Sequence, residues 1–74
     1  MTLIWNDDNP AYRAEYGKYE LIVYRHGGNS YSARMAYNRI DKVVHYGQQS
    51  LNEAKYKCEI LMLRDVCERE GVVL

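Results

Sequence analysis

The cysteines and histidines of this sequence have the chemistry for nucleophilic, acid–base or metal-binding work: Cys58, Cys67, His26 and His45. Cysteine and histidine hold zinc when short spacings such as C-x-x-C or H-x-x-x-H bring them together. Neither spacing occurs here. Nothing near either cysteine in the sequence marks it as a reactive thiol. We therefore expect both cysteines to be small core residues rather than nucleophiles or metal ligands.

The two cysteines also bear on the compartment of the protein. Cys58 and Cys67 fall in one predicted helix, nine residues apart, which is about 13 Å along its axis. A disulfide needs Cα atoms within about 7 Å, so the two cannot pair within that helix. Two reduced thiols, no membrane-length apolar run and no signal-peptide pattern predict a cytoplasmic protein.

The histidines give no stronger sign of catalysis. His26 stands in the stretch His26–Asn29, which is rich in glycine but lacks the Lys-Ser/Thr and the following helix of a phosphate-binding loop. We expect His26 to be exposed in a turn. His45 is expected on the outer face of a sheet, as a surface histidine. The sequence therefore predicts a protein that is not an enzyme, with no catalytic residue, cofactor or metal.

The composition sets further bounds. The chain has 74 residues, which predicts one domain spanning 1–74. A domain this small buries only roughly 60% of its unfolded surface, and oligomerisation often adds the missing stability. Acidic and basic residues are balanced at 10 each, which argues against a DNA mimic and against a general binder of phosphate backbones. Eight tyrosines and no phenylalanine suit half-exposed surfaces and interfaces.

The first half of the chain predicts an antiparallel sheet. Thr2–Trp5 is expected to be an edge strand, ended by a turn at Asn6–Pro10. Tyr12–Tyr16 and Tyr19–Tyr24 flank Gly17-Lys18, which is the signal of a two-residue hairpin. This hairpin places Tyr16 opposite Tyr19, Ala14 opposite Leu21, and Tyr12 opposite Val23.

The next predicted strand is Ser30–Tyr37, in which apolar and polar residues alternate. A three-residue loop, His26–Gly28, is expected to join it to the strand before and to set Val23 against Tyr31. A loop of four would turn every side chain to the opposite face, so the shorter loop is predicted.

Lys42–Tyr46 is the last predicted strand, and a four-residue turn at Asn38–Asp41 sets Met35 opposite Val44. The fold class is therefore α+β: an antiparallel meander of three to five strands, followed by one long C-terminal helix packed on one face. The opposite face of the sheet carries a candidate binding set in this register: Ile22, Tyr24, Arg34, Val43 and His45.

Ser50–Glu70 is predicted to be one helix of about 20 residues. Ser50 to Glu53 has the S-x-x-E pattern of a capping box, and Gly71 follows the end. At about 100° per residue, two apolar stripes form on opposite sides. The stripe expected to lie on the sheet contains Leu51, Ala54, Cys58, Leu61 and Met62. The other, called the outward stripe below, contains Tyr56, Ile60, Leu63 and Cys67 at the 4, 3, 4 spacing of a coiled-coil seam.

One sheet covers only one side of such a helix, so something else must cover the outward stripe. Within the chain, the candidates are Leu3, Ile4 and Trp5, or the apolar tail Val72–Leu74. The other candidate is a protein partner, most simply a second copy that packs helix on helix to form a homodimer. A large exposed apolar patch on a small protein is otherwise unexpected.

The outer face of the predicted sheet also has two interpretations. It is either a mixed solvated face or a binding face, because Tyr24 and Arg34 are the residue types on which small folds stack single-stranded bases. Double-stranded-RNA-binding domains share a sheet followed by a helix. This chain lacks their N-terminal helix, and the start of its own helix has acidic Glu53 in place of a lysine cluster.

Five features follow one another along the chain: Trp5, Tyr16-Gly17-Lys18-Tyr19, a strand rich in Tyr and Ala, a glycine turn, and Ser50–Lys55. This order resembles a broad group of small phage and prophage accessory proteins, with a short antiparallel sheet and one S-L-x-E-A-K helix. The resemblance implies a protein that binds and blocks a host protein, as anti-CRISPR and other anti-defence inhibitors do. It assigns no individual functional residue.

Three functions are therefore carried forward. The leading hypothesis is a non-enzymatic protein-binding module, a phage-type inhibitor of a host or defence protein such as a CRISPR effector, acting by steric occlusion. The alternative is a small nucleic-acid-binding module that uses Tyr24, Arg34 and His45. The third is a structural protein whose role is self-assembly.

Overall fold

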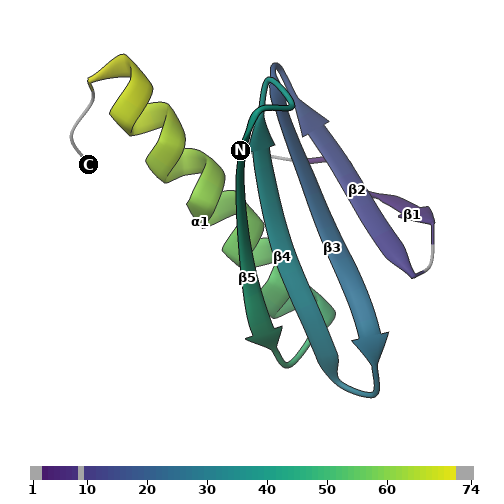
Figure 1. The fold of residues 1–74 in the computed structure, drawn as a ribbon. Coiled ribbons are helices and arrows are strands. Elements are labelled where there is room, and N and C mark those ends of the chain that lie inside the picture. Colours follow the sequence, from purple (N-terminus) through teal and green to yellow (C-terminus); the bar gives the residue numbers. More distant parts are fainter. Residues whose placement is uncertain (1–2, 9, 72–74) are drawn as a thin grey trace.

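The computed structural model describes residues 3–8 and 10–71. Five strands precede one helix: β1 (Asn6–Asp8), β2 (Ala11–Tyr16), β3 (Tyr19–Gly27), β4 (Ser30–Tyr37), β5 (Asp41–Gln48) and α1 (Leu51–Glu70). The strands form one antiparallel sheet in the order β1-β2-β3-β4-β5. The helix lies against one face of that sheet and runs back toward the β2–β3 and β4–β5 turns (Figure 1). The predicted α+β meander with one C-terminal helix is confirmed.

The first strand is not where the sequence suggested. Of the predicted strand Thr2–Trp5, residue 2 lies outside the described part and residues 3–5 are not in a strand. The polar residues Asn6–Asp8, which were expected to be a turn, form β1 instead. Leu3 and Trp5 pack against the core cluster, so burial of their apolar surface outweighs their preference for a strand.

The β2–β3 hairpin has the predicted register. Tyr16 pairs with Tyr19, and Tyr12 pairs with Val23. Gly17 has a φ of 59°, which is the left-handed conformation that a two-residue hairpin turn requires at its first position. A local glycine signal was therefore sufficient to set this pairing.

The β3–β4 hairpin is shifted by two residues from the prediction. Val23 pairs with Ala33 rather than Tyr31, and Leu21 pairs with Met35. The strand β3 runs on to Gly27, with an irregularity after Arg25, so the loop is shorter than expected. A shift of two residues leaves each side chain on its original face, so the predicted core face of both strands remains right.

The β4–β5 turn is one residue shorter than predicted. Tyr37 pairs with Asp41, and the backbone N–H of Ile40 donates to the Tyr37 carbonyl at 3.0 Å. Asn38 and Arg39 both have left-handed φ values, 52° and 63°. Asparagine tolerates this conformation, but arginine at the second position gives no sequence signal for it.

This shorter turn reverses the faces of β5, because a slip of one residue turns every side chain over. Met35 pairs with Val43 instead of Val44, and Ala33 pairs with His45. The prediction that Val43 and His45 lie on the outer face is therefore wrong: both point to the helix side. Val44 takes their place on the outer face, opposite Arg34.

The core lies between α1 and the inner face of the sheet. The helix contributes Ala54, Cys58, Leu61 and Met62, all of which are buried, with Leu51 partly buried beside them. The predicted sheet-facing stripe of the helix is confirmed. The sheet contributes a buried set to the same cluster: Ala14, Tyr19, Leu21, Val23, Ala33 and Met35.

Both ends of α1 lie where the capping residues predict them. The Ser50 hydroxyl accepts a hydrogen bond from the backbone N–H of Glu53 at 3.1 Å. The Glu53 carboxylate accepts from the N–H of Gln49 rather than from that of Ser50, so only half of the expected capping box forms. Gly71 is left-handed, with a φ of 71°, and its N–H donates to the Cys67 carbonyl.

Candidate protein-binding surfaces

The outward stripe of α1 lies opposite the buried stripe. Tyr56 is 63% exposed and Leu63 is 39% exposed, while Ile60 and Cys67 are half-buried. None of the four belongs to the buried core cluster. The helix therefore presents apolar side chains on the side that the sheet does not cover.

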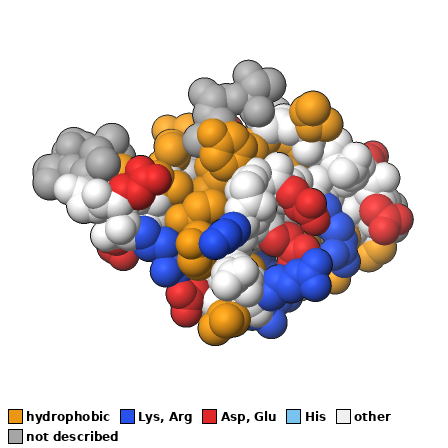
Figure 2. All heavy atoms as spheres, turned by 90° about the horizontal axis from the view of Figure 1, so that it is seen from above, with side chains coloured by type: hydrophobic (Ala, Val, Ile, Leu, Met, Phe, Trp, Pro, Cys, Tyr) orange, Lys and Arg blue, Asp and Glu red, His pale blue; other side chains and the backbone are white. Residues whose placement is uncertain are grey.

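The apolar surface continues from the outward stripe into a groove. Leu63 also lines this open groove of about 390 Å³, which lies between the β2–β3 turn and the C-terminal half of α1. The other lining residues are Tyr16, Gly17, Lys18, Tyr19, Tyr37, Val66 and Glu70. Figure 2 shows this end of the molecule, where hydrophobic side chains gather in the middle and charged ones lie around them.

The N-terminal residues leave this surface open. Leu3 and Trp5 pack on the core cluster, and the Trp5 ring lies 5.4 Å from Lys55 Nζ, while Ile4 is 80% exposed. With these residues in place, Tyr56 and Leu63 remain exposed. The other predicted cover, Val72–Leu74, lies outside the described residues.

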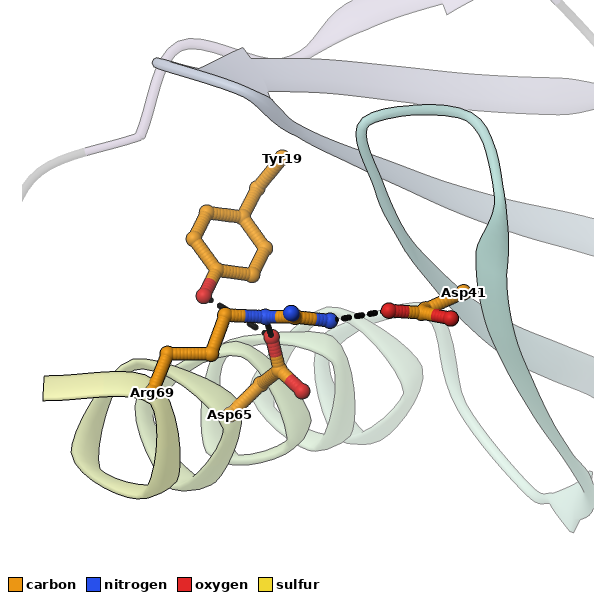
Figure 3. A network of polar contacts seen from close by, with 4 residues as sticks. All are labelled: Tyr19, Asp41, Asp65 and Arg69. Carbon is orange, nitrogen blue, oxygen red and sulfur yellow. Dashed lines mark hydrogen bonds and ion pairs between the residues drawn. The ribbon is translucent and has the colours of Figure 1, made fainter. Parts of the chain in front are cut away.

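A polar network fastens the C-terminal half of α1 to the sheet (Figure 3). The Tyr19 hydroxyl donates to Asp65 Oδ2 at 2.8 Å, and Arg69 Nε donates to the same oxygen at 2.6 Å. The Arg69 guanidinium also pairs with Asp41 at the start of β5, and it lies 3.7 Å from the centre of the Tyr37 ring. These contacts tie α1 to β3, β4 and β5, and so hold one wall of the groove in place.

The groups of this network satisfy one another. Burial, followed by the hydrogen bond to Asp65, raises the pKa of Tyr19 to about 12. The hydrogen bonds to Asp41 and Asp65 raise the pKa of Arg69, which stays cationic. The sequence analysis missed this network. Its one local signal is the i,i+4 spacing of Asp65 and Arg69, because Tyr19 and Asp41 come from distant parts of the chain.

The outer face of the sheet holds three of the five predicted residues. Ile22, Tyr24 and Arg34 lie there, while Val43 and His45 lie on the helix side. Ile22 is nevertheless buried, because its cross-strand neighbours are Arg13 and Arg34, whose long side chains cover it.

An aromatic cluster that the sequence analysis missed lies on the same outer face. The His26 ring centre is 6.4 Å from that of Tyr24 and 6.1 Å from that of Tyr46, and His26 Nε2 is 2.9 Å from Ser32 Oγ. His26 belongs to β3 rather than to a turn. The alternation of Tyr24 and His26 could have indicated their shared face, but Tyr46 joins them only through the β5 register.

Cys58 and Cys67 occupy contrasting places on α1, and both are free thiols. Cys58 is fully buried, with its Sγ 3.6 Å from the Arg34 carbonyl oxygen and 3.7 Å from that of Ile22. Burial raises the pKa of the Cys58 thiol to about 12, which makes it unreactive. The prediction that Cys58 is a core residue is confirmed. The same prediction for Cys67 is wrong, because Cys67 is half-buried on the outward stripe and lies outside the core cluster.

The described residues contain no group of three or more His, Cys, Asp or Glu side chains placed to hold a metal ion. Their one helix is not apolar enough over its length to cross a membrane.

Comparison with known proteins adds no relative. No protein-family model, curated protein or solved structure matches this chain. Function is therefore inferred from the surfaces of the chain itself.

Proposed function

We propose that this protein is a non-enzymatic protein-binding module that docks through the outward stripe of α1. The observation that carries the proposal is the exposure of Tyr56 and Leu63 on the side of the helix opposite the core. Neither side chain belongs to the core cluster between the helix and the sheet. Apolar patches of this kind on small proteins mark interaction sites.

The spacing of the stripe indicates the shape of the partner. Tyr56, Ile60, Leu63 and Cys67 follow the 4, 3, 4 spacing of a seam that receives another helix. The adjoining groove adds apolar surface from Tyr16 and Tyr37, and Lys18 and Glu70 also line it. The partner is accordingly a protein that presents an apolar helical ridge with charged residues beside it.

The mode of action that follows is steric. A rigid domain of 8.7 kDa, fixed on the surface of a larger protein, blocks whatever that surface binds. Inhibition of a host or defence protein, including a CRISPR effector, is the finer form of this proposal. It rests on the resemblance of the chain to phage accessory proteins, and the exposed stripe is compatible with it.

The test compares wild-type protein with Leu63→Lys as bait in a bacterial lysate, followed by titration calorimetry against each purified protein retained. We expect a specific partner that binds wild type and that Leu63→Lys loses, because a charge is placed in the apolar seam. Glu15→Lys, on an exposed position of β2, is the matched control and should bind as wild type does.

Two outcomes would count against docking on a separate target. If Leu63→Lys retains the same proteins with the same affinity, the outward stripe is not the docking site. If Leu63→Lys instead converts a wild-type homodimer into a monomer and no other partner is found, a second copy of the chain occupies the stripe.

A second function is favoured by the aromatic cluster of the outer sheet face. Tyr24 and Tyr46 offer ring faces for stacking, and Arg34 on the same face offers a charge for phosphate. His26 is the histidine on this outer face, where His45 was predicted to lie. Single-stranded oligonucleotide binding that weakens with salt and is lost in Tyr46→Ala would favour this function, while unchanged binding in Tyr46→Ala would remove it.

A further inference from the structure

The strand β5 is a free edge of the sheet. It is eight residues long, and among residues 3–8 and 10–71 β4 is its only partner in the sheet order. About half of its backbone N–H and C=O groups, or about four of each, therefore point away from β4. Val44 is 41% exposed and Tyr46 is 73% exposed on its outer side. Long edges with apolar side chains pair readily with another strand.

The opposite edge of the sheet is built differently. The strand β1 has three residues, all exposed, and two of them are aspartates. Short and charged edges resist pairing with other chains. The protein thus protects the β1 edge more strongly than the β5 edge, where the charged residues are Asp41 and Lys42 at the start of the strand and the register against β4 is irregular between His45 and Gln48.

We infer that β5 pairs antiparallel with β5 of a second copy, about a two-fold axis at Val44, and joins the two five-stranded sheets into one. A two-fold contact uses the same patch on both chains, so the patch must complement itself. The order of residues along β5 shows whether the strand can complement a second copy of itself. The contact is independent of the proposed docking stripe, which points away from the sheet and stays free.

Pairing about Val44 makes β5 self-complementary. Val44 of one copy faces Val44 of the other, a favourable β-branched pair. Lys42 of one copy faces Tyr46 of the other, where its ammonium covers the most exposed ring on the strand. No like charges stand opposite each other. Centring the pair on Lys42 would place two lysines together, which disfavours that register.

On the helix side of β5, the remaining cross-strand pair of the dimer lies next to a groove. In this register Val43 of one copy faces His45 of the other, on the face that carries α1. An open groove of about 160 Å³ lies there, lined by Met35, Val43, Leu61, Arg64, Asp65 and Glu68. A cavity of about 150 Å³ holds a benzene-sized group. The imidazole of the second copy therefore fits, and its N–H can donate to the Glu68 carboxylate.

The first experiment measures mass in solution by light scattering, for wild type, Val44→Lys and Leu63→Lys. We expect wild type and Leu63→Lys at twice the 8.7 kDa of the chain, and Val44→Lys at the monomer mass. Val44 lies on the outer face, so Val44→Lys should keep the wild-type circular dichroism spectrum. Wild type that is monomeric at every concentration, or a dimer that Val44→Lys leaves intact, overturns the inference.

The second experiment tests the register with a cysteine at the axis, in a Cys67→Ser background. Directly opposed residues of antiparallel strands have Cα atoms about 4.5–5.5 Å apart, which is within the range of a disulfide. We expect Val44→Cys to form a covalent dimer on mild oxidation. The matched control is Arg13→Cys, on the exposed side of β2, which should not. No enrichment of covalent dimer over this control overturns the register centred on Val44.

Discussion

The two long faces of α1 have similar residue types and opposite surroundings. Ala54, Cys58 and Met62 on one face are completely buried, whereas Tyr56 and Leu63 on the other are exposed. Both faces are apolar, but the sheet covers only the first. One face therefore stabilises the fold, and the other is available to a partner. The difference separates residues that hold the protein together from residues that are free to act.

The native cysteines give the most sensitive test of the difference between the two faces of α1, because each face carries one. Cys58 should react with a thiol reagent only after unfolding, whereas Cys67 should react through local fraying of the helix end. At a stability of about 5 kcal/mol, the two rates differ by about 10³-fold or more. Mass spectrometry of a labelling time course measures both sites. Equal rates would show that α1 does not hold Cys58 against the sheet.

Shortening Met62 should give the largest loss of stability among substitutions on α1. Met62→Ala leaves a cavity under a fully buried side chain and should lower the free energy of unfolding by about 2–5 kcal/mol. Urea denaturation followed by circular dichroism measures it. Met62→Leu, which conserves volume, is the control and should lose less than about 1.5 kcal/mol. A small loss in Met62→Ala would contradict the assignment of this face to the core.

The Tyr19–Asp65 contact fixes the end of the buried face to β3, and its removal should have a moderate effect. Tyr19→Phe should lower the free energy of unfolding by about 1 kcal/mol at neutral pH, because one buried hydrogen bond is lost. The pKa of Tyr19 is raised from 10 to about 12. The stabilisation by its hydroxyl is therefore full below pH 10 and is lost as the pH rises toward 12.

Denaturation curves of wild type and Tyr19→Phe at increasing pH measure this effect. The difference between the two proteins should be constant below pH 10 and should narrow between pH 10 and 12. Cys58, whose pKa is also raised by burial, ionises in both proteins and cancels in the difference. A difference that does not change over this range would mean that folding does not raise the pKa of Tyr19.

Shortening Leu63 should have the smallest effect on stability. Leu63 belongs to the outward stripe and is exposed, so Leu63→Ala should change the free energy of unfolding by no more than about 0.5 kcal/mol. The same denaturation assay serves, with Met62→Ala as the contrasting neighbour. A loss as large as that of Met62→Ala would mean that the outward stripe is already covered within the chain.

Local signals predicted the fold wherever one residue decided the geometry. Gly17 set the β2–β3 register, and Ser50 and Gly71 set the ends of the helix. The two stripes of α1 followed from helical periodicity alone. The predicted TLIW strand failed because apolar residues next to a core pack into it rather than extend the sheet, as Leu3 and Trp5 do.

The candidate site was predicted less completely than the fold. The positions of the outward stripe came from periodicity, but which apolar face meets the sheet became certain only from burial. The groove beside Leu63 joins the helix to Tyr16 and Tyr37 of the sheet. The aromatic cluster joins Tyr46 to His26 from another strand. Such contacts between distant segments leave no spacing in the sequence.

The sequence by itself determined an α+β arrangement with a glycine hairpin, a capped helix and two apolar helical stripes, because each of these depends on neighbours within a few residues. Only the tertiary structure decided which side chains of β5 point to the helix. The β4–β5 turn sets this, and Arg39 gives no sequence signal for the length of that turn. The observed length places Val43 and His45 on the helix side. It also decided the Tyr19–Asp65–Arg69 network. Both depend on how separate strands and the helix meet, which local propensity does not specify.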